Sequence, residues 1–140
     1  MTILVRRIQA SDEAMLTHVA PGVFDEPIRP EWLSRYLRRP GHILVLAFDG
    51  DTVVGQCAGV VHFHPDKPAE LYVDEVGTAD DWLRRGIATA MLAELFAWGR
   101  ELGCEEAWLG AETDNHAALA LYRRHAPTED ETMQFFVFRI

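Results

Sequence analysis

The sequence has no long hydrophobic run, no internal repeat and only two cysteines, Cys57 and Cys104. No stretch is long enough to span a bilayer, and the N-terminal residues lack the apolar run of a signal peptide. Two cysteines set among apolar residues do not make a disulfide framework, so reduced and buried thiols are expected. These absences predict a cytoplasmic globular protein without a membrane partner.

Positive charge is also scarce, since 13 Lys and Arg stand against 22 Asp and Glu, a formal net charge of -9. This balance argues against nucleic acid and anionic membrane as main partners and is compatible with a cationic substrate. A length of 140 residues suffices for a hydrophobic core, and no boundary interrupts it. We therefore expect a single domain, residues 1–140.

The hydrophobic pattern alternates between strand-like and helix-like segments. Strands are expected at Thr2–Gln9, Ile43–Phe48, Thr52–Phe63, Glu70–Thr78, Glu105–Ala111 and, as a buried strand, Thr132–Ile140. Helices are expected after Ser11 as N-cap, from Pro30, over Ile87–Leu102 and from Asp114-Asn115. A hairpin at 49–51 and a helical crossover after 78 favour an α/β fold. Its central sheet is mixed and mostly antiparallel, with about four flanking helices.

A short turn with two arginines and a glycine joins the strand ending at Thr78 to the long helix. Arg84, Arg85 and Gly86 lie directly before the first helical residue. The first N–H groups of a helix have no partners inside it, and the helix dipole makes this end partly positive. The turn can therefore hold a phosphate, with the glycine allowing close approach and the arginines adding charge. An ordinary turn with two solvated arginines is the alternative.

A second motif follows later in the chain, Asp114-Asn115-His116-Ala117-Ala118-Leu119-Ala120-Leu121-Tyr122. Together, the turn and this motif resemble the GNAT superfamily of acetyl-CoA-dependent N-acetyltransferases. The likeness covers the element order of nearly the whole chain. Two segments look more narrowly like the type I aminoglycoside 3-N-acetyltransferases. They are the strand Glu70-Leu71-Tyr72-Val73-Asp74-Glu75-Val76 and the ending Glu131-Thr132-Met133-Gln134-Phe135.

The resemblance implies a coenzyme A site built on the Gly86 turn, with the preceding strand offering backbone groups to the pantetheine arm. The implied cofactor-binding residues are Val76, Gly77, Thr78, Arg84, Arg85, Gly86, Ile87, Ala88, Thr89, Asn115 and Tyr122. Asn115 has a second interpretation as the cap of the fourth helix.

Acetyl transfer to an amine needs a base for the ammonium proton and an acid for the departing thiolate. Tyr122 lies where the family places its general acid, and a structural tyrosine packed on the sheet is the alternative. Glu75 is the first choice for the base. Asp74 is second, because a regular strand points it to the opposite face, although a bulge could exchange the two. Glu112 is third.

The acceptor implied by the resemblance is a small cationic amine, most closely an aminoglycoside acetylated on its 3-amino group. Four carboxylates are expected near it: Asp25, Glu26, Glu75 and Glu112. A polyamine, an amino acid or a protein N-terminus is the alternative acceptor, and a non-catalytic acyl-CoA-binding domain is a further reading. An acidic surface without any ligand also fits. The family's habit implies a homodimer.

His62 and His64 alternate along one strand, which places both imidazoles on one side. Closed zinc sites use four ligands, and the sequence offers no obvious third one here. We therefore expect no metal site.

Overall fold

The computed structural model describes residues 2–140, which fall into two compact units, one reaching to Leu109 and the other Gly110–Ile140. The first unit holds every strand and two of the α-helices. Its elements are β1 (Ile3–Ile8), the 3-10 helix η1 (Ala10–Leu16), α1 (Pro30–Arg38), β2 (His42–Asp49), β3 (Thr52–His62), β4 (Glu70–Thr78), the 3-10 helix η2 (Asp80–Trp82), α2 (Ile87–Glu101) and β5 (Glu106–Trp108). The second unit contains α3 (His116–Arg124).

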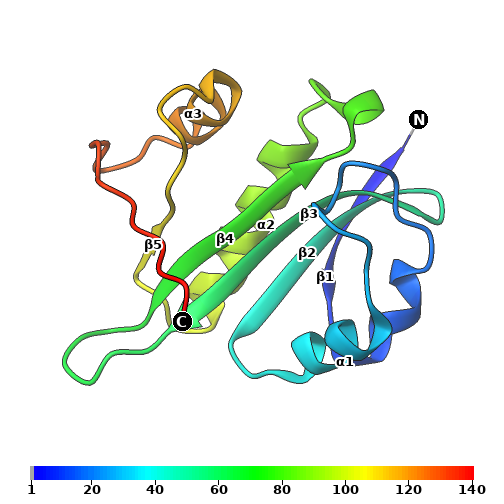
Figure 1. Cartoon of the computed structure of the whole chain (residues 1–140), viewed down its shortest axis with the longest axis horizontal. Coiled ribbons are helices and arrows are strands. Elements are labelled where there is room, and N and C mark those ends of the chain that lie inside the picture. Colours follow the sequence, from blue (N-terminus) through cyan, green and yellow to red (C-terminus); the bar gives the residue numbers. More distant parts are fainter. Residues whose placement is uncertain (1) are drawn as a thin grey trace. The chain divides into compact units, whose positions relative to one another are not determined.

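The five strands form one sheet in the order β1-β2-β3-β4-β5. The first three pairings are antiparallel, whereas β4 and β5 pair in parallel. The parallel pair follows from the α2 crossover, because a helix returns the chain to the starting end of the sheet. The mixed, mostly antiparallel sheet predicted from sequence is confirmed, and β4 has the predicted bounds (Figure 1).

Both faces of the sheet are covered, since α2 lies behind the strands and α1 in front of them (Figure 1). Leu44, Leu46 and Phe48 alternate along β2 into the core cluster on the α1 side, which also contains Leu16 of η1. The intervening residues of β2 are equally buried. A strand that is buried on both faces has an uninterrupted apolar sequence, as residues 43–48 do.

The first helix differs from its prediction. It is a 3-10 helix, and its cap is Gln9 rather than Ser11. The Gln9 N–H donates to Asp12 Oδ2 at 2.8 Å, and the Asp12 N–H donates to Gln9 O at 2.9 Å. The Asp12 carboxylate therefore closes the turn two residues before the serine could.

The buried strand predicted at Thr132–Ile140 is wrong. This segment lies in the second unit, contains neither helix nor strand, and exposes every side chain, including Phe135 at 84% and Phe138 at 80%. Strand propensity mostly reflects packing on a neighbouring strand, and the aromatic run has no such partner in the second unit. Among the residues described, no helix is both long and apolar enough to cross a membrane.

Candidate functional site

The most informative irregularity of the sheet is a bulge in β4. Ala58 of β3 pairs with Glu75, and the next residue, Gly59, pairs with Val73, so Asp74 is the extra residue. An extra residue breaks the alternation of side chains along a strand. Asp74 and Glu75 consequently line the same pocket. The strand is therefore not regular, which was the condition for placing Asp74 on the opposite face, and the bulge named as the alternative is present.

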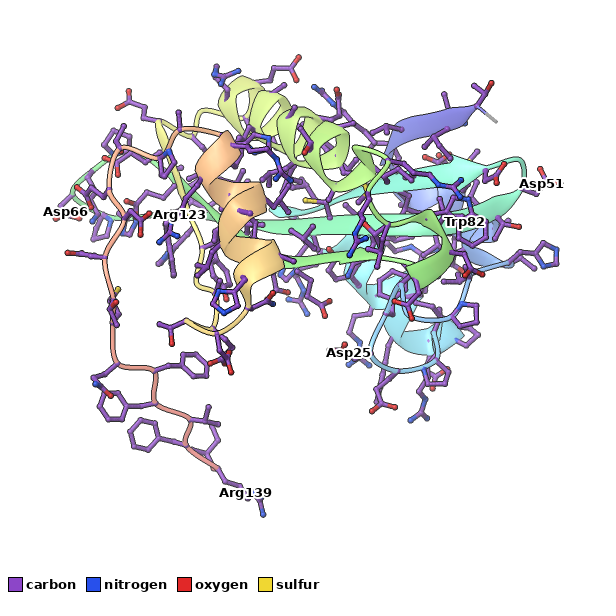
Figure 2. All side chains as sticks on the ribbon, turned by 90° about the horizontal axis from the view of Figure 1, so that it is seen from above. Asp25, Asp51, Asp66, Trp82, Arg123 and Arg139 are labelled. Carbon is purple, nitrogen blue, oxygen red and sulfur yellow. The ribbon has the colours of Figure 1, made fainter. Side chains whose placement is uncertain are left out.

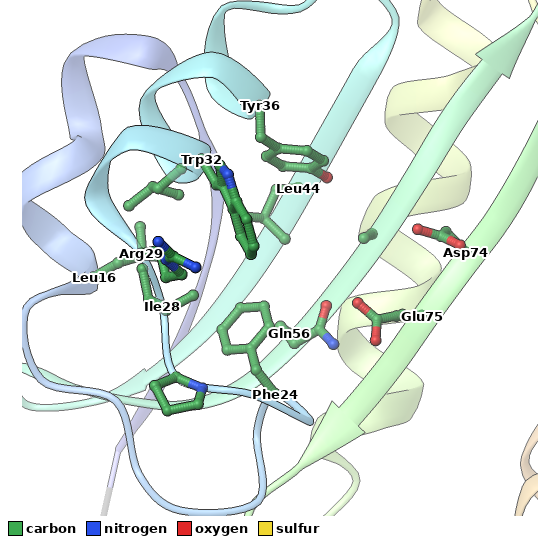
Figure 3. Close-up of a pocket in the computed structure, with 13 residues that line it drawn as sticks. Leu16, Phe24, Ile28, Arg29, Trp32, Tyr36, Leu44, Gln56, Asp74 and Glu75 are labelled. Atoms are coloured by element: carbon green, nitrogen blue, oxygen red, sulfur yellow. The ribbon is translucent and has the colours of Figure 1, made fainter.

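The pocket has a volume of about 210 Å³ and lies between β4, β3, α1 and the segment before α1. Its apolar lining consists of Leu16, Phe24, Pro27, Ile28, Trp32, Leu33, Leu44 and Ala58. Its polar lining consists of Arg29, Tyr36, Gln56, Asp74 and Glu75. Figure 3 shows Glu75 reaching from β4 toward Gln56, with Phe24, Trp32 and Tyr36 on the other side. The site is an apolar cavity with two carboxylates at one end.

The carboxyl of Glu75 has the electrostatics of a base. Burial raises its pKa, and the charges of Asp74 and Asp25 raise it further. A carboxylate surrounded by other negative charges holds a proton more readily, so its affinity for a substrate proton rises. Asp25 contributes from the irregular segment before α1, near the α1 end of the molecule in Figure 2.

Tyr36 closes the α1 side of the pocket. Burial raises the pKa of its phenol well above the usual range, and the charges of Asp74 and Glu75 add to the shift. Its hydroxyl donates to Ile43 O at 3.4 Å, and its ring meets His42 edge to face at 5.3 Å. The phenol stays protonated and offers the site a fixed neutral hydroxyl.

Arg29 stands at the mouth of the pocket. Its guanidinium lies over the Trp32 ring, 4.3 Å from the centroid, and pairs with Glu31 at 3.0 Å. This arginine is the cationic side chain among the residues that line the cavity, across from the two carboxylates. The pocket is therefore acidic at its β4 end, and at its α1 side it carries an arginine that is paired with Glu31.

The segment that carries Phe24 and Asp25 is fixed to β4 by a close backbone approach. The carbonyl oxygen of Val23 lies where a side chain on Gly77 would stand. The same oxygen accepts a hydrogen bond from Gln56 Nε2 at 3.4 Å. Gly77 thus has a packing reason to be glycine, and its predicted cofactor contact stays a prediction.

The turn before α2 has the backbone of a phosphate-binding turn. Gly86 caps the helix with φ +76°, and Arg84 also has a positive φ of +62°. Glycine adopts this left-handed conformation at little cost, and alternating turns of this kind aim successive N–H groups at one point. The first helical hydrogen bond runs from Ala90 N–H to Gly86 O at 3.0 Å. The N–H groups of 87–89 therefore precede the helical ladder.

The outer edge of β4 is open over its second half. β5 pairs only with Glu70, Leu71 and Tyr72. In the described part of the chain, no strand pairs with the outer edge from Val73 to Thr78. Open strand edges accept extended ligands through main-chain hydrogen bonds. This edge leads directly to η2 and then to the Gly86 turn.

The remaining predicted site residues divide between the two units. Glu26 is exposed and does not line the pocket, unlike Glu75. Asn115 caps α3 by accepting the Ala118 N–H at 3.1 Å, which confirms the capping interpretation. Tyr122 lies on α3, half-buried, and Glu112 precedes that helix as an exposed residue. Their roles in the reaction stay predictions.

Sequence reasoning missed the aromatic and polar wall of the pocket. On α1, Tyr36 lines the cavity and packs against the core, whereas Trp32 lines the cavity from an exposed position. Phe24 and Arg29 lie in or beside a proline-rich irregular segment that carries no periodic signal. Gln56, at 2% exposure, could have been noticed as a polar residue inside an apolar strand.

Known proteins are similar to this chain in sequence and in fold. Residues 9–126 match the family model of the acetyltransferase (GNAT) family. The N-alpha-acetyltransferase RimI of Mycobacterium tuberculosis is 37% identical over 101 residues, which make up 72% of this chain and 61% of that protein. The chain thus spans less than two thirds of the length of this relative.

Two solved structures share the fold at low sequence identity. An aminoglycoside acetyltransferase from an uncultured soil metagenomic sample, in complex with sisomicin, superposes with a TM-score of 0.84 at 19% identity, covering 99% of this chain and 96% of that one. AAC(6')-Iy, in complex with a bisubstrate analogue of coenzyme A and acetylneamine, superposes with a TM-score of 0.77 at 16% identity and full coverage of both chains. With the match over residues 9–126, these findings establish that the chain belongs to the acetyltransferase (GNAT) family.

Proposed function

We propose that this chain transfers an acetyl group from acetyl-CoA to a primary amine, with Glu75 as the general base. The observation that carries the proposal is the β4 bulge, which places Asp74 and Glu75 in one pocket. An alkylamine is mostly protonated at neutral pH, so its proton must leave before it can attack. The raised pKa of Glu75 suits that transfer.

Acetyl-CoA is the proposed acetyl donor. The pyrophosphate would be held by the N–H groups of residues 86–89 and by the arginines of the turn, and the pantetheine arm would run along the open edge of β4. Those residues fit the group because a positive-φ turn at a helix N-terminus is built for anions. The same fold has been solved with a coenzyme A analogue in AAC(6')-Iy.

The neutral amine attacks the thioester carbonyl carbon, a tetrahedral adduct forms, and the carbon–sulfur bond breaks. The amine proton goes to Glu75, and the departing thiolate takes a proton for which Tyr122 is the proposed donor. Direct attack needs no covalent enzyme intermediate. Burial raises the pKa of the Cys57 thiol to about 12, which suits a structural thiol and not a nucleophile.

An aminoglycoside is the first proposed acceptor, acetylated on its 3-amino group. Several ammonium groups gain from several carboxylates, and Asp25, Asp74 and Glu75 form such a group. The fold neighbour solved with sisomicin supports this class. The narrower likeness to the type I 3-N enzymes is part of this proposal.

The α-amine of a peptide N-terminus is the second candidate acceptor. The mostly apolar lining and Arg29 at the mouth favour an acceptor with one amine, an apolar side chain and a carbonyl or carboxylate group. The similarity to an N-alpha-acetyltransferase supports the same class.

The test is acetyl-CoA-dependent thiol release against aminoglycosides, polyamines, amino acids and short peptides. Asp25→Asn separates the two candidates, because it should raise KM for a polycation by up to about fivefold, the equivalent of about 1 kcal/mol. KM for a peptide with one amine should change little. Silence across the panel, with coenzyme A still bound, would contradict both acceptor assignments.

Tyr122→Phe tests whether Tyr122 donates the proton to the departing thiolate. Acetyl-CoA binding, measured by calorimetry, should persist in the variant. Turnover should fall, since the phenol proton is gone and the ring is kept. Unchanged turnover would remove Tyr122 from the mechanism.

A further inference from the structure

The β3–β4 hairpin brings three metal-ligating side chains together, away from the acetyl-transfer pocket. His62 is the last residue of β3, and its cross-strand partner is Glu70, the first residue of β4. His64 follows His62 by two residues, so alternation along an extended chain keeps it on the same side. The sequence offered two ligands here, and the pairing of the strands supplies the third.

The three side chains are close enough to share one ion. His64 Nε2 lies 2.7 Å from Glu70 Oε1, and the rings of His62 and His64 have centroids 4.4 Å apart. One ligating atom from each of the three residues lies within 4.8 Å of the others. Zinc–ligand bonds of 2.0–2.2 Å at tetrahedral angles separate ligand atoms by roughly 3.3 Å. Binding would therefore close the wider gaps by at most about 1.5 Å and open the His64–Glu70 pair by about 0.6 Å.

Two of the three donors are held in place before any ion arrives. The side chains of His64 and Glu70 are only 15% and 19% exposed. His62 is exposed and remains free to swing onto an ion. Pro65 and Pro68 stiffen the connecting loop, because each fixes its own φ. The arrangement therefore costs little ordering on binding.

We propose that His62, His64 and Glu70 form a binding site for a divalent transition metal, with Zn²⁺ as the preferred ion. Two imidazole nitrogens and one carboxylate are a donor set that suits zinc, and three protein ligands leave one position for water. Calcium and magnesium are disfavoured because they take oxygen ligands. The ion would hold the two strands together where they enter the connecting loop.

The site is separate from the proposed acetyl transfer. Glu70 and Glu75 lie five residues apart on β4, roughly 17 Å along a strand. Figure 2 shows Asp66, in the hairpin loop, at the opposite end of the first unit from Trp82, which precedes the Gly86 turn. The chelator EDTA should therefore lower stability and leave acetyl transfer unchanged. A failure to bind zinc would therefore not count against the proposed acetyl transfer, and a failure of acetyl transfer would not count against the metal site.

The experiment is calorimetric titration of the metal-stripped chain with zinc chloride, together with thermal unfolding in zinc and in EDTA. One zinc per chain and a higher unfolding temperature in zinc are expected. His62→Asn and His64→Asn should each weaken zinc binding by about 100-fold or more, and Glu70→Gln by at least about tenfold. His18→Asn is the control, because His18 is exposed and lies outside the cluster.

Glu70→Gln also separates the metal site from a simple ion pair. The amide oxygen can still accept a hydrogen bond from His64, so the metal-free variant should fold with nearly unchanged stability. Loss of the zinc effect in that variant supports the site. Absence of saturable zinc binding to the original chain, or equal binding by all four variants, would overturn the proposal.

Discussion

Gly77→Ala tests how the proposed acceptor pocket is assembled. The added methyl group would stand against the carbonyl oxygen of Val23, and Gln56 Nε2 lies 3.5 Å from the same point. A backbone carbonyl cannot rotate away as a flexible side chain can. The segment that carries Phe24 and Asp25 must therefore move, or β4 must distort.

The expected cost combines two effects. Overpacking of this kind costs about 1–3 kcal/mol. Loss of the hydrogen bond from Gln56 to Val23 O adds about 1 kcal/mol. The free energy of unfolding should fall by about 2–4 kcal/mol, which lowers the urea midpoint by about 1–2 M if the denaturant slope is about 2 kcal/mol per M.

Urea unfolding followed by circular dichroism measures this change, and acetyl-transfer kinetics measures its functional side. Gly110→Ala is the control, since a methyl group there meets nothing within 4 Å. In Gly77→Ala, KM for the acceptor should rise more than KM for acetyl-CoA, because the displaced segment lines the proposed acceptor pocket. A stability loss below about 0.5 kcal/mol, the range of ordinary surface substitutions, would refute the close approach.

Three further predictions use the same geometry. Asp25→Asn should move the acidic limb of the pH profile of kcat/KM to lower pH. The Asp25 charge raises the pKa of Glu75, so without that charge Glu75 ionises at lower pH. An acidic limb that does not move would mean that it reports a group other than Glu75. Gly86→Ala should lower the free energy of unfolding by about 1–2 kcal/mol, because alanine is strained in the left-handed backbone conformation, and it should raise KM for acetyl-CoA. Gly86→Asn should lose less stability, because asparagine tolerates that conformation better. Thermal unfolding and initial rates measure the two effects. Cys57 and Cys104 are buried with raised thiol pKa values, so they should react with a thiol reagent only on unfolding; fast labelling of the native chain would contradict their burial.

The sequence predicted the structure correctly for segments whose conformation depends on residues adjacent to them along the chain. The bounds of β4 were predicted correctly, because an apolar run bounded by turn residues can hardly be anything but a strand. Asn115 was recognised as a cap since its amide needs only the N–H groups of the following turn. The place of the Gly86 turn directly before α2 was predicted in the same way, whereas its left-handed backbone is a finding of the structure.

The wrong predictions arose where a distant segment decides. The run from Phe135 to Phe138 has high strand propensity, yet it is exposed and unpaired within its own unit. Propensity alone cannot provide a partner strand. The cap of η1 is an exception, because the cause there is local: the Asp12 side chain accepts the Gln9 N–H, which makes Gln9 and not Ser11 the cap.

The sequence by itself determined the family and the fold class, because these depend on motifs that the chain carries contiguously, and it supplied the residue proposed for each chemical step. The tertiary structure decided which carboxylates act together. The bulge brings Asp74 to the side of Glu75, and a segment fifty residues away brings the charge of Asp25. It also completed the His62, His64 and Glu70 cluster by pairing two strand ends. Distance through space, not along the chain, sets electrostatic coupling and shared coordination, and only folding fixes that distance.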